Sequence, residues 1–385
     1  MAESQLVDQI WTLVGQSGVS HLPWQAPVMW AVGGLFIFLA IKKKIEPLLL
    51  LPIGFTVIMM NIPLGGLMHR PDAVDSIPGL LYMFNEYGLR TDLIPCLIFL
   101  GLGAMTDFGP LIANPKTLLL GAAAQFGVFV ALMGALLLGF DLQSACAIGI
   151  IGGADGPTTI FTATSLKVSD TVLGACAISA YSYMAMVPII QPPIIKLLTT
   201  RQERGITMKQ LRPVNRTEKI LFPIAGGLVI CMLVPKATPL IAMFMLGNLF
   251  ATSGAVERLK ESAQNELMNI VTIFLGIAVG STMQGEPFLT SDVLKIYLLG
   301  LVAFSFSTAG GVLFAKLMNL FVEEPINPLL GSAGVSAVPM AARVSQRLGT
   351  EANPKCYILM HAMGPNVAGV IGTVVAAGIF ITLAG

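Results

Sequence analysis

Asp155 is a carboxylate in the middle of an otherwise apolar, glycine-rich stretch, residues 149–159. A charged side chain inside a membrane is costly, so a carboxylate there needs a cation, a proton or a polar lining. Thr158 and Thr159 add hydroxyl oxygens beside it, and oxygen-rich, flexible coordination suits a hard cation. The alternative is a protonated Asp155 that caps a break in a helix.

A second stretch rich in glycine and proline, residues 327–343, offers only neutral oxygens. Asn327, Ser332 and Ser336 supply these oxygens, while Gly331 and Gly334 allow the backbone to approach a ligand closely. One carboxylate with several neutral oxygens balances a monovalent ion better than a divalent one. The two stretches together therefore favour sodium or a proton over calcium.

Other polar side chains extend this set of candidates. Arg343 keeps its charge in any surroundings, so it either binds a carboxylate or carbamate as a fork or snorkels to the membrane interface. Tyr181 and Tyr183 are either buried donors and proton sources or members of an interfacial aromatic belt. Asn366 follows a proline, so it is either a further oxygen ligand or part of a plain proline kink.

The composition indicates a membrane protein, because 55% of the residues are hydrophobic and 11% are charged, against about 25% charged in soluble domains. The net charge of +1 gives no field that would attract nucleic acid. The cysteines and histidines lack metal-ligand spacing, so we expect no transition metal. Glu3 and Asp8 lie where a signal peptide would be basic, so we expect the spans themselves to direct insertion.

The elements that must position these residues are membrane helices. A helix needs about 20 apolar residues to cross the hydrocarbon core, and roughly ten to twelve segments between residues 28 and 384 approach that length. Segments 151–157 and 327–339 contain too much glycine and proline for plain helices. Because lipid cannot satisfy irregular backbone, we predict an all-α polytopic protein whose two broken or re-entrant segments meet near the membrane midplane.

Short matches that recur in the same order predict two related repeats. Residues 98–101 match 273–276, residues 152–155 lie against 331–334, and the helix after Glu46 resembles the helix after Glu218. We predict an N-terminal part (1–44), a first repeat (45–199), a basic loop (200–217) and a second repeat (218–385). The N-terminal part would hold a first span and a surface helix at 5–14, for which a frayed tail is the alternative.

The orientation of the chain follows from its basic clusters and its repeats. Paired glycine-interrupted segments in two halves point to a transporter site between inverted repeats. An inverted arrangement puts the basic cluster at 42–44 and the basic loop at 200–217 on opposite sides. By the positive-inside rule, we expect the longer loop in the cytoplasm.

Four blocks resemble one family, the β subunits of the sodium-pumping decarboxylases for oxaloacetate, methylmalonyl-CoA, glutaconyl-CoA and malonate. The blocks are residues 149–157, 181–184, 327–343 and 361–369, and the likeness runs from about residue 44 to the C-terminus. The resemblance implies a subunit of the bacterial cytoplasmic membrane. It would decarboxylate carboxybiotin, export sodium and consume a proton.

The resemblance also implies roles for individual residues. Asp155, Asn327 and Ser336 would bind sodium or be linked to it, and Gly331 would shape the loop. Tyr183 and Arg343 would take part in proton delivery or contact carboxybiotin. With the oxygens of Ser332 and Asn366, these residues make up the predicted site.

The implied partners are a soluble carboxyltransferase α subunit, a biotin carrier protein or domain, a small membrane γ or δ subunit and further copies of the chain. The biotin attachment sequence is absent, so we expect carboxybiotin to arrive on another chain. The segment between Asn61 and Pro78 is short compared with the oxaloacetate members, which favours a CoA ester or malonate system. A stand-alone sodium-coupled symporter or exchanger is the alternative, because its ion site would look similar.

Overall fold

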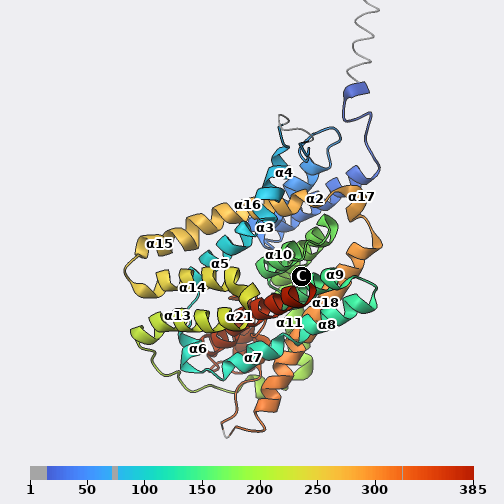
Figure 1. The fold of residues 1–385 in the computed structure, drawn as a ribbon. Coiled ribbons are helices and arrows are strands. Elements are labelled where there is room, and N and C mark those ends of the chain that lie inside the picture. Colours follow the sequence, from blue (N-terminus) through green and yellow to red (C-terminus); the bar gives the residue numbers. More distant parts are fainter. Residues whose placement is uncertain (1–14, 72–76, 323) are drawn as a thin grey trace, which may run out of the picture.

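The computed structural model describes residues 15–71, 77–322 and 324–385, and its regular elements in these ranges are all helices (Figure 1). The predicted surface helix at 5–14 lies outside the described residues. The first half contains α2 (Gln25–Lys42), α3 (Pro47–Met60), α4 (Leu80–Phe84), η1 (Asn85–Leu89), α5 (Leu93–Met105), α6 (Gly109–Ala113), α7 (Thr117–Ala124), α8 (Phe126–Leu137), α9 (Leu142–Ile150), η2 (Ile151–Gly153), α10 (Gly156–Ser165) and α11 (Asp170–Leu198).

The second half repeats a similar order of long and short helices. After the short α12 (Arg201–Arg204) come α13 (Arg216–Leu233), η3 (Pro235–Ala237), α14 (Thr238–Ser253), α15 (Glu257–Ser262), η4 (Ala263–Leu267), α16 (Met268–Ser281), α17 (Gly285–Phe288), α18 (Ser291–Met318), α19 (Leu329–Ser332), α20 (Met340–Ala352) and α21 (Leu359–Ala384). The basic loop lies between α11 and α13.

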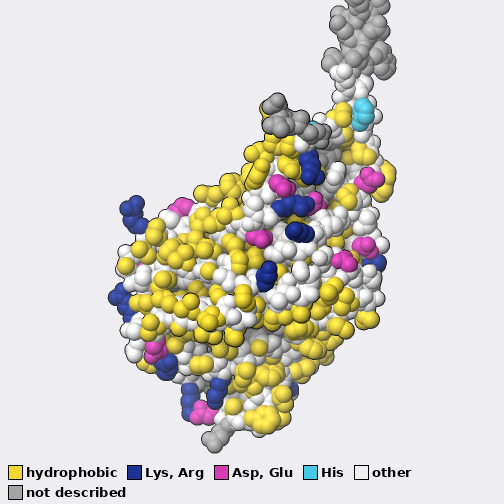
Figure 2. Space-filling model, in the orientation of Figure 1, with side chains coloured by type: hydrophobic (Ala, Val, Ile, Leu, Met, Phe, Trp, Pro, Cys, Tyr) yellow, Lys and Arg dark blue, Asp and Glu magenta, His cyan; other side chains and the backbone are white. Residues whose placement is uncertain are grey.

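Six helical segments of the described chain are long and apolar enough to cross a membrane, or seven if the bent pair of α4–η1 and α5 counts as one span. Apolar side chains cover much of the face drawn in Figure 2, and charged side chains are few and scattered over it. The prediction of an all-α multi-pass membrane protein is confirmed. The expected ten to twelve segments also include shorter helices such as α3, which this length criterion does not count.

The two halves of the chain pack on each other reciprocally. Helix α3 lies against α16, and α5 lies against α14; η1 lies against α16, and η4 lies against α5. Further along, α7 packs on α21 and α18 packs on α11. These reciprocal contacts indicate that α2 corresponds to α13 in the other half, α3 to α14 and α5 to α16. The short sequence matches paired α3 with α13 instead, one helix away.

Helices α5 and α14 touch backbone to backbone. A side chain on Gly103 would overlap the carbonyl oxygen of Phe244, and one on Gly247 would overlap the carbonyl oxygen of Leu100. Small residues allow such close approach between membrane helices, where packing rather than hydrophobicity drives association. The pair therefore forms a tight frame on one side of the molecule, seen with α13 and α16 at the left of Figure 1.

The segment α9–η2–α10 is a hairpin whose two arms begin and end at the same place. Near its start, Gln143 Nε2 donates to the carbonyl oxygen of Ala384 at 3.3 Å, and just after its end Leu166 lies against Gly385. Both ends therefore lie at the C-terminal end of α21. We call residues 142–165 hairpin 1.

The segment from Asn327 through α20 forms a second hairpin. Its ends meet where Ser345 Oγ donates to the carbonyl oxygen of Leu329 at 2.9 Å. Asn353, just past α20, donates to the carbonyl oxygen of Gly205 at 3.0 Å. We call residues 327–352 hairpin 2, and its base lies on the loop that follows α12.

The two hairpins enter from opposite ends of α21. His361, at the start of α21, contacts the basic loop through a 2.7 Å hydrogen bond to the carbonyl oxygen of Lys209, whereas Ala384 lies at the base of hairpin 1. The 26 residues of α21 span about 39 Å at 1.5 Å per residue. The hairpin tips meet between these ends, where Ser336 N donates to the carbonyl oxygen of Gly153 at 3.1 Å.

Candidate functional site

Asp155 lies at the tip of hairpin 1 and caps α10. Ala154, just before it, has a left-handed backbone with φ of 53°, which ends η2 and turns the chain into α10. Asp155 Oδ1 then accepts the backbone N–H of Thr158 at 3.0 Å, as an N-cap residue does. The capping role and the ion-binding role are therefore compatible, because only one carboxylate oxygen is used by the cap.

The second oxygen of Asp155 has no hydrogen-bond partner among the described residues, although it is buried. The hydroxyl groups of Thr158 and Tyr181 are also buried without partners. Buried polar atoms in native proteins are nearly always paired. A carboxylate oxygen and hydroxyl oxygens left open around one helix start fit a hard monovalent cation.

A chain of side-chain hydrogen bonds joins the tip of hairpin 2 to α21 and α7. Ser336 Oγ lies 2.5 Å from Thr373 Oγ1, and Thr373 Oγ1 donates to Gln125 Oε1 at 3.0 Å. Gln125 interrupts the apolar span between α7 and α8, and its Nε2 also donates to the carbonyl oxygen of Gly369 at 3.2 Å. These side chains fix the tip of hairpin 2 beside Gly153 of hairpin 1.

Two buried amides hold the irregular backbone of hairpin 2. Asn366 Nδ2 donates to the carbonyl oxygens of Ala333 and Val335, at 2.9 and 2.7 Å. Gln191 Nε2 donates to the carbonyl oxygen of Ser332 at 2.9 Å. The amide oxygens of Asn366 and Gln191 are buried and have no partner within the described chain. Both remain open as oxygen ligands.

The other predicted residues of hairpin 2 shape it rather than face an open site. Asn327 donates to the carbonyl oxygens of Arg204 and Ile206, at 2.9 and 2.8 Å, so it ties the hairpin base to the loop. Ser332 Oγ donates to the carbonyl oxygen of Leu329 at 2.8 Å. Gly331 packs on Gly311 of α18 so closely that no side chain would fit.

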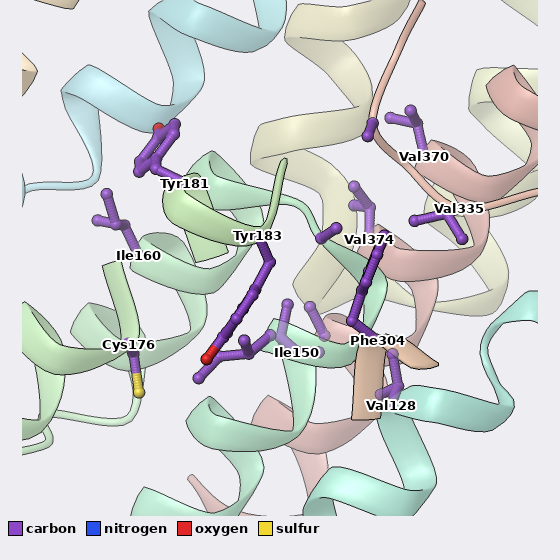
Figure 3. Close-up of a cluster of buried hydrophobic side chains, with 14 of the residues drawn as sticks. Val128, Ile150, Ile160, Cys176, Tyr181, Tyr183, Phe304, Val335, Val370 and Val374 are labelled. Atoms are coloured by element: carbon purple, nitrogen blue, oxygen red, sulfur yellow. The ribbon is translucent and has the colours of Figure 1, made fainter. Parts of the chain in front are cut away.

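The two tyrosines of α11 lie on different sides of that helix (Figure 3). The ring of Tyr181 covers Gly156, the residue after Asp155, so closely that a side chain at Gly156 would overlap it. Tyr183 packs beside Gly300 and donates to the carbonyl oxygen of Tyr297. The phenol next to the Asp155 site is therefore Tyr181, and the predicted Tyr183 lies against α18.

Arg343 lies in the first turn of α20 and is exposed. No hydrogen bond or ion pair engages its guanidinium within the described residues. Arg347, one turn further from the hairpin tip, donates to the carbonyl oxygen of Pro188 on α11 at 3.2 Å. Arg343 is thus a free cation beside α11, nearer the tip than Arg347.

Comparison with known proteins identifies the family. Residues 25–384 match the family described as the Na+-transporting oxaloacetate decarboxylase beta subunit. The chain is 55% identical over 374 residues to the methylmalonyl-CoA decarboxylase subunit beta of Veillonella parvula and to the glutaconyl-CoA decarboxylase subunit beta of Acidaminococcus fermentans, covering 97% of each chain. The chain belongs to the β subunits of the Na+-transporting decarboxylases.

Members of this β-subunit family differ in length. The probable oxaloacetate decarboxylase beta chain of Vibrio cholerae is 48% identical over 430 aligned positions, covering 97% of this chain and 99% of the relative. That alignment exceeds the 385 residues of this chain, so the relative carries residues that have no counterpart here. The CoA-ester members, by contrast, align over 374 residues.

In this β-subunit structure, polar contacts tie the base of hairpin 1 to α5. Asp92, just before α5, accepts hydrogen bonds from Thr164 and, at 3.3 Å, from Ser165. Arg90 pairs with Asp170 of α11 at 2.7 Å. We call these five residues the α5 clamp. It links hairpin 1 and α11 to the start of α5, at the end of α21 away from the basic loop.

Sequence reasoning placed Tyr181 among the candidates but did not select it, and it missed Gln125, Gln191 and Thr373. The sequence did contain a signal for these residues, because any polar side chain inside a membrane span is a candidate for function. Gln125 and Gln191 both interrupt apolar segments. Which of them face the tips depends on helix rotation, which the sequence did not fix.

Sodium binding at Asp155 predicts a stability change that needs no turnover. A ligand that binds only the folded state stabilises it, so sodium should raise the melting temperature of the purified chain above its value in potassium. Asp155→Asn should abolish that increment. Asp141→Asn is the matched control, because Asp141 caps α9 through Ser144 N at 3.0 Å and lies away from the tips. An undiminished increment in Asp155→Asn would remove Asp155 from the sodium site.

Proposed function

We propose that the chain is the membrane subunit that decarboxylates carboxybiotin carried by a partner chain and couples this reaction to sodium export. The observation that carries the proposal is the buried, half-partnered carboxylate of Asp155 in a member of the Na+-transporting decarboxylases. Sodium would bind between the free Asp155 oxygen and the hydroxyl oxygens beside it. Ser336 and Asn366 would contribute from the facing tip.

The chemistry needs a dry cavity and a proton. Carboxybiotin loses CO₂ when its N–C bond breaks and the electron pair passes to the ureido nitrogen, which takes up one proton. Removing water from the carboxylate favours this step. Tyr181, beside Asp155, has a hydroxyl with no acceptor of its own, and a phenol gives up its proton more readily than the aliphatic hydroxyl of Thr158, so we assign it the proton delivery. Arg343 would orient the incoming carboxylate through its free guanidinium.

Sodium export requires that the site open to each side in turn. We propose that residues 25–198 and 216–384 are inverted repeats, supported by the reciprocal packing of their helices and by hairpins based at opposite ends of α21. The first repeat would then begin at α2, ahead of the predicted start at residue 45. The α5 clamp would then close one end in the described conformation.

The proposed partners follow from the chemistry. A carboxyltransferase α subunit and a biotin carrier would supply carboxybiotin, because this chain lacks a biotin attachment sequence. A small γ or δ membrane subunit and further copies of the chain would complete the complex in the bacterial inner membrane. The higher identity to the methylmalonyl-CoA and glutaconyl-CoA members favours a CoA ester as the substrate of the whole complex.

The direct test reconstitutes the chain in liposomes and supplies carboxybiotin. We expect CO₂ release that is stimulated by sodium and accompanied by sodium movement across the membrane. Potassium in place of sodium is the control. If folded samples leave carboxybiotin intact while another solute drives sodium flux, the symporter alternative holds.

The two tyrosines offer a matched pair of variants. Tyr181→Phe removes the hydroxyl beside Asp155 and should lower turnover by about 100-fold, the usual contribution of a positioned proton donor. Tyr183→Phe removes only a hydrogen bond to backbone and should keep turnover within about twofold. Steady-state CO₂ release measures both. A reversed order would return the proton-delivery role to Tyr183.

We expect the contacts of the α5 clamp to break during each transport cycle. A disulfide between Asp92→Cys and Ser165→Cys, whose side chains are in hydrogen-bond contact in this structure, should stop sodium transport, and reduction should restore it. Each single cysteine variant under oxidant serves as the control. Full transport by the cross-linked protein would show that hairpin 1 stays against α5 throughout the cycle.

A further inference from the structure

A cavity of about 850 Å³ lies at the base of hairpin 2, at the end of the molecule opposite the α5 clamp. Its wall comes from the basic loop at 206–212, from the start of α7, from residues 318–322 and 324–326 and from His361 of α21. We propose that this cavity is the receiving site for the carboxylated ureido ring of carboxybiotin, before the head group reaches the hairpin tips. The inference rests on the proposed function and names where its substrate first binds.

His361 lines this cavity and has an unused hydrogen-bond acceptor in its ring. Its side chain is 9% exposed, and its Nε2 lies 2.7 Å from the carbonyl oxygen of Lys209. A carbonyl only accepts, so Nε2 carries the proton and Nδ1 of the neutral ring is an acceptor. Nδ1 is buried and has no partner in the described part of the chain. Nδ1 could therefore accept a hydrogen bond from an N–H group of a ligand.

Lys116 offers the cavity a positive charge that could bind an anion. Three cations line the cavity, but Lys209 is paired with Glu324 and Arg212 with Glu218 at 2.9 Å. Lys116 has no ion pair with any described residue, so its ammonium is available to an anion. The cavity is thus suited to a ligand that carries both a negative charge and an N–H group.

A carboxylated ureido ring meets both requirements. One ring nitrogen carries the carboxylate, which Lys116 would bind, and the other nitrogen keeps its N–H, which His361 Nδ1 would accept. Leu120, Leu330, Met208 and Met318 add apolar wall for the fused sulfur-containing ring. The volume lies within the range of about 300–1,000 Å³ that small-molecule sites occupy.

The cavity also lies where a tethered ring would arrive. Its rim is the basic loop that we place in the cytoplasm, and its inner wall includes Leu330, within hairpin 2. Gly369, which packs on the tip of hairpin 2, follows His361 by two turns of α21, about 12 Å. The ring therefore docks close to the hairpin that must move, yet apart from Asp155.

The test separates docking from chemistry by kinetics with free carboxybiotin in liposomes. Lys116→Gln and His361→Leu should raise KM about tenfold, the effect of losing one strong hydrogen bond, while kcat and the sodium concentration for half-maximal rate stay unchanged. Lys116→Arg and His361→Gln keep the charge and the acceptor and should largely restore KM. Lys236→Gln is the matched control, because Lys236 is exposed in η3, outside this cavity.

A second readout does not depend on activity. A cysteine at position 116, in Lys116→Cys, should react with a charged maleimide, and biotin in excess should slow that reaction; a cysteine in Lys236→Cys should be unaffected. If the wild type decarboxylates carboxybiotin but Lys116→Gln and His361→Leu match Lys236→Gln in KM, the receiving site is elsewhere and only this inference falls. If the wild type leaves carboxybiotin intact, the proposed function itself fails.

Discussion

The structure depends on one constraint, the need to pair irregular backbone at membrane depth. Lipid offers no hydrogen bonds, so broken helices survive there only when protein or a polar cavity satisfies them. The two hairpin tips satisfy each other where Ser336 N meets the carbonyl oxygen of Gly153, and the amide groups of Asn366 and Gln191 hold three further carbonyls. The tips are therefore held together by groups that an ion site can also use.

This pairing leaves a surplus of oxygens. The side-chain amides of Asn366 and Gln191 donate their N–H₂ groups to backbone carbonyls, which leaves their oxygens without a partner among the described residues. Asp155 uses only one of its two oxygens to cap α10. Uncompensated buried acceptors are unfavourable, so a bound cation would stabilise the very conformation in which the tips meet. Sodium binding and the geometry of the tips would thereby be linked.

The sequence revealed the hairpins and Asp155 because both depend on local signals, a glycine and proline run and a carboxylate among apolar residues. It could not choose between Tyr181 and Tyr183, which differ by about 200° around a helix, because that choice depends on how α11 is rotated against α10. The hydrogen bonds of Asn327 were equally hidden, since its partners at Arg204 and Ile206 lie more than a hundred residues away. The upstream repeat matches were too short to fix which helix pairs with which.

Coupling follows from where the proton donor and the ion site lie. Tyr181 packs on Gly156, so sodium at Asp155 and proton loss from Tyr181 would both act on the same turn of hairpin 1. A positive ion there favours the deprotonated phenol, and reprotonation of the phenol weakens sodium binding by the same free energy, because linkage is reciprocal. In the proposed mechanism, decarboxylation would withdraw that proton and thereby tighten sodium binding in the closed site. Proton return from the far side, once the α5 clamp opens, would release the ion outward.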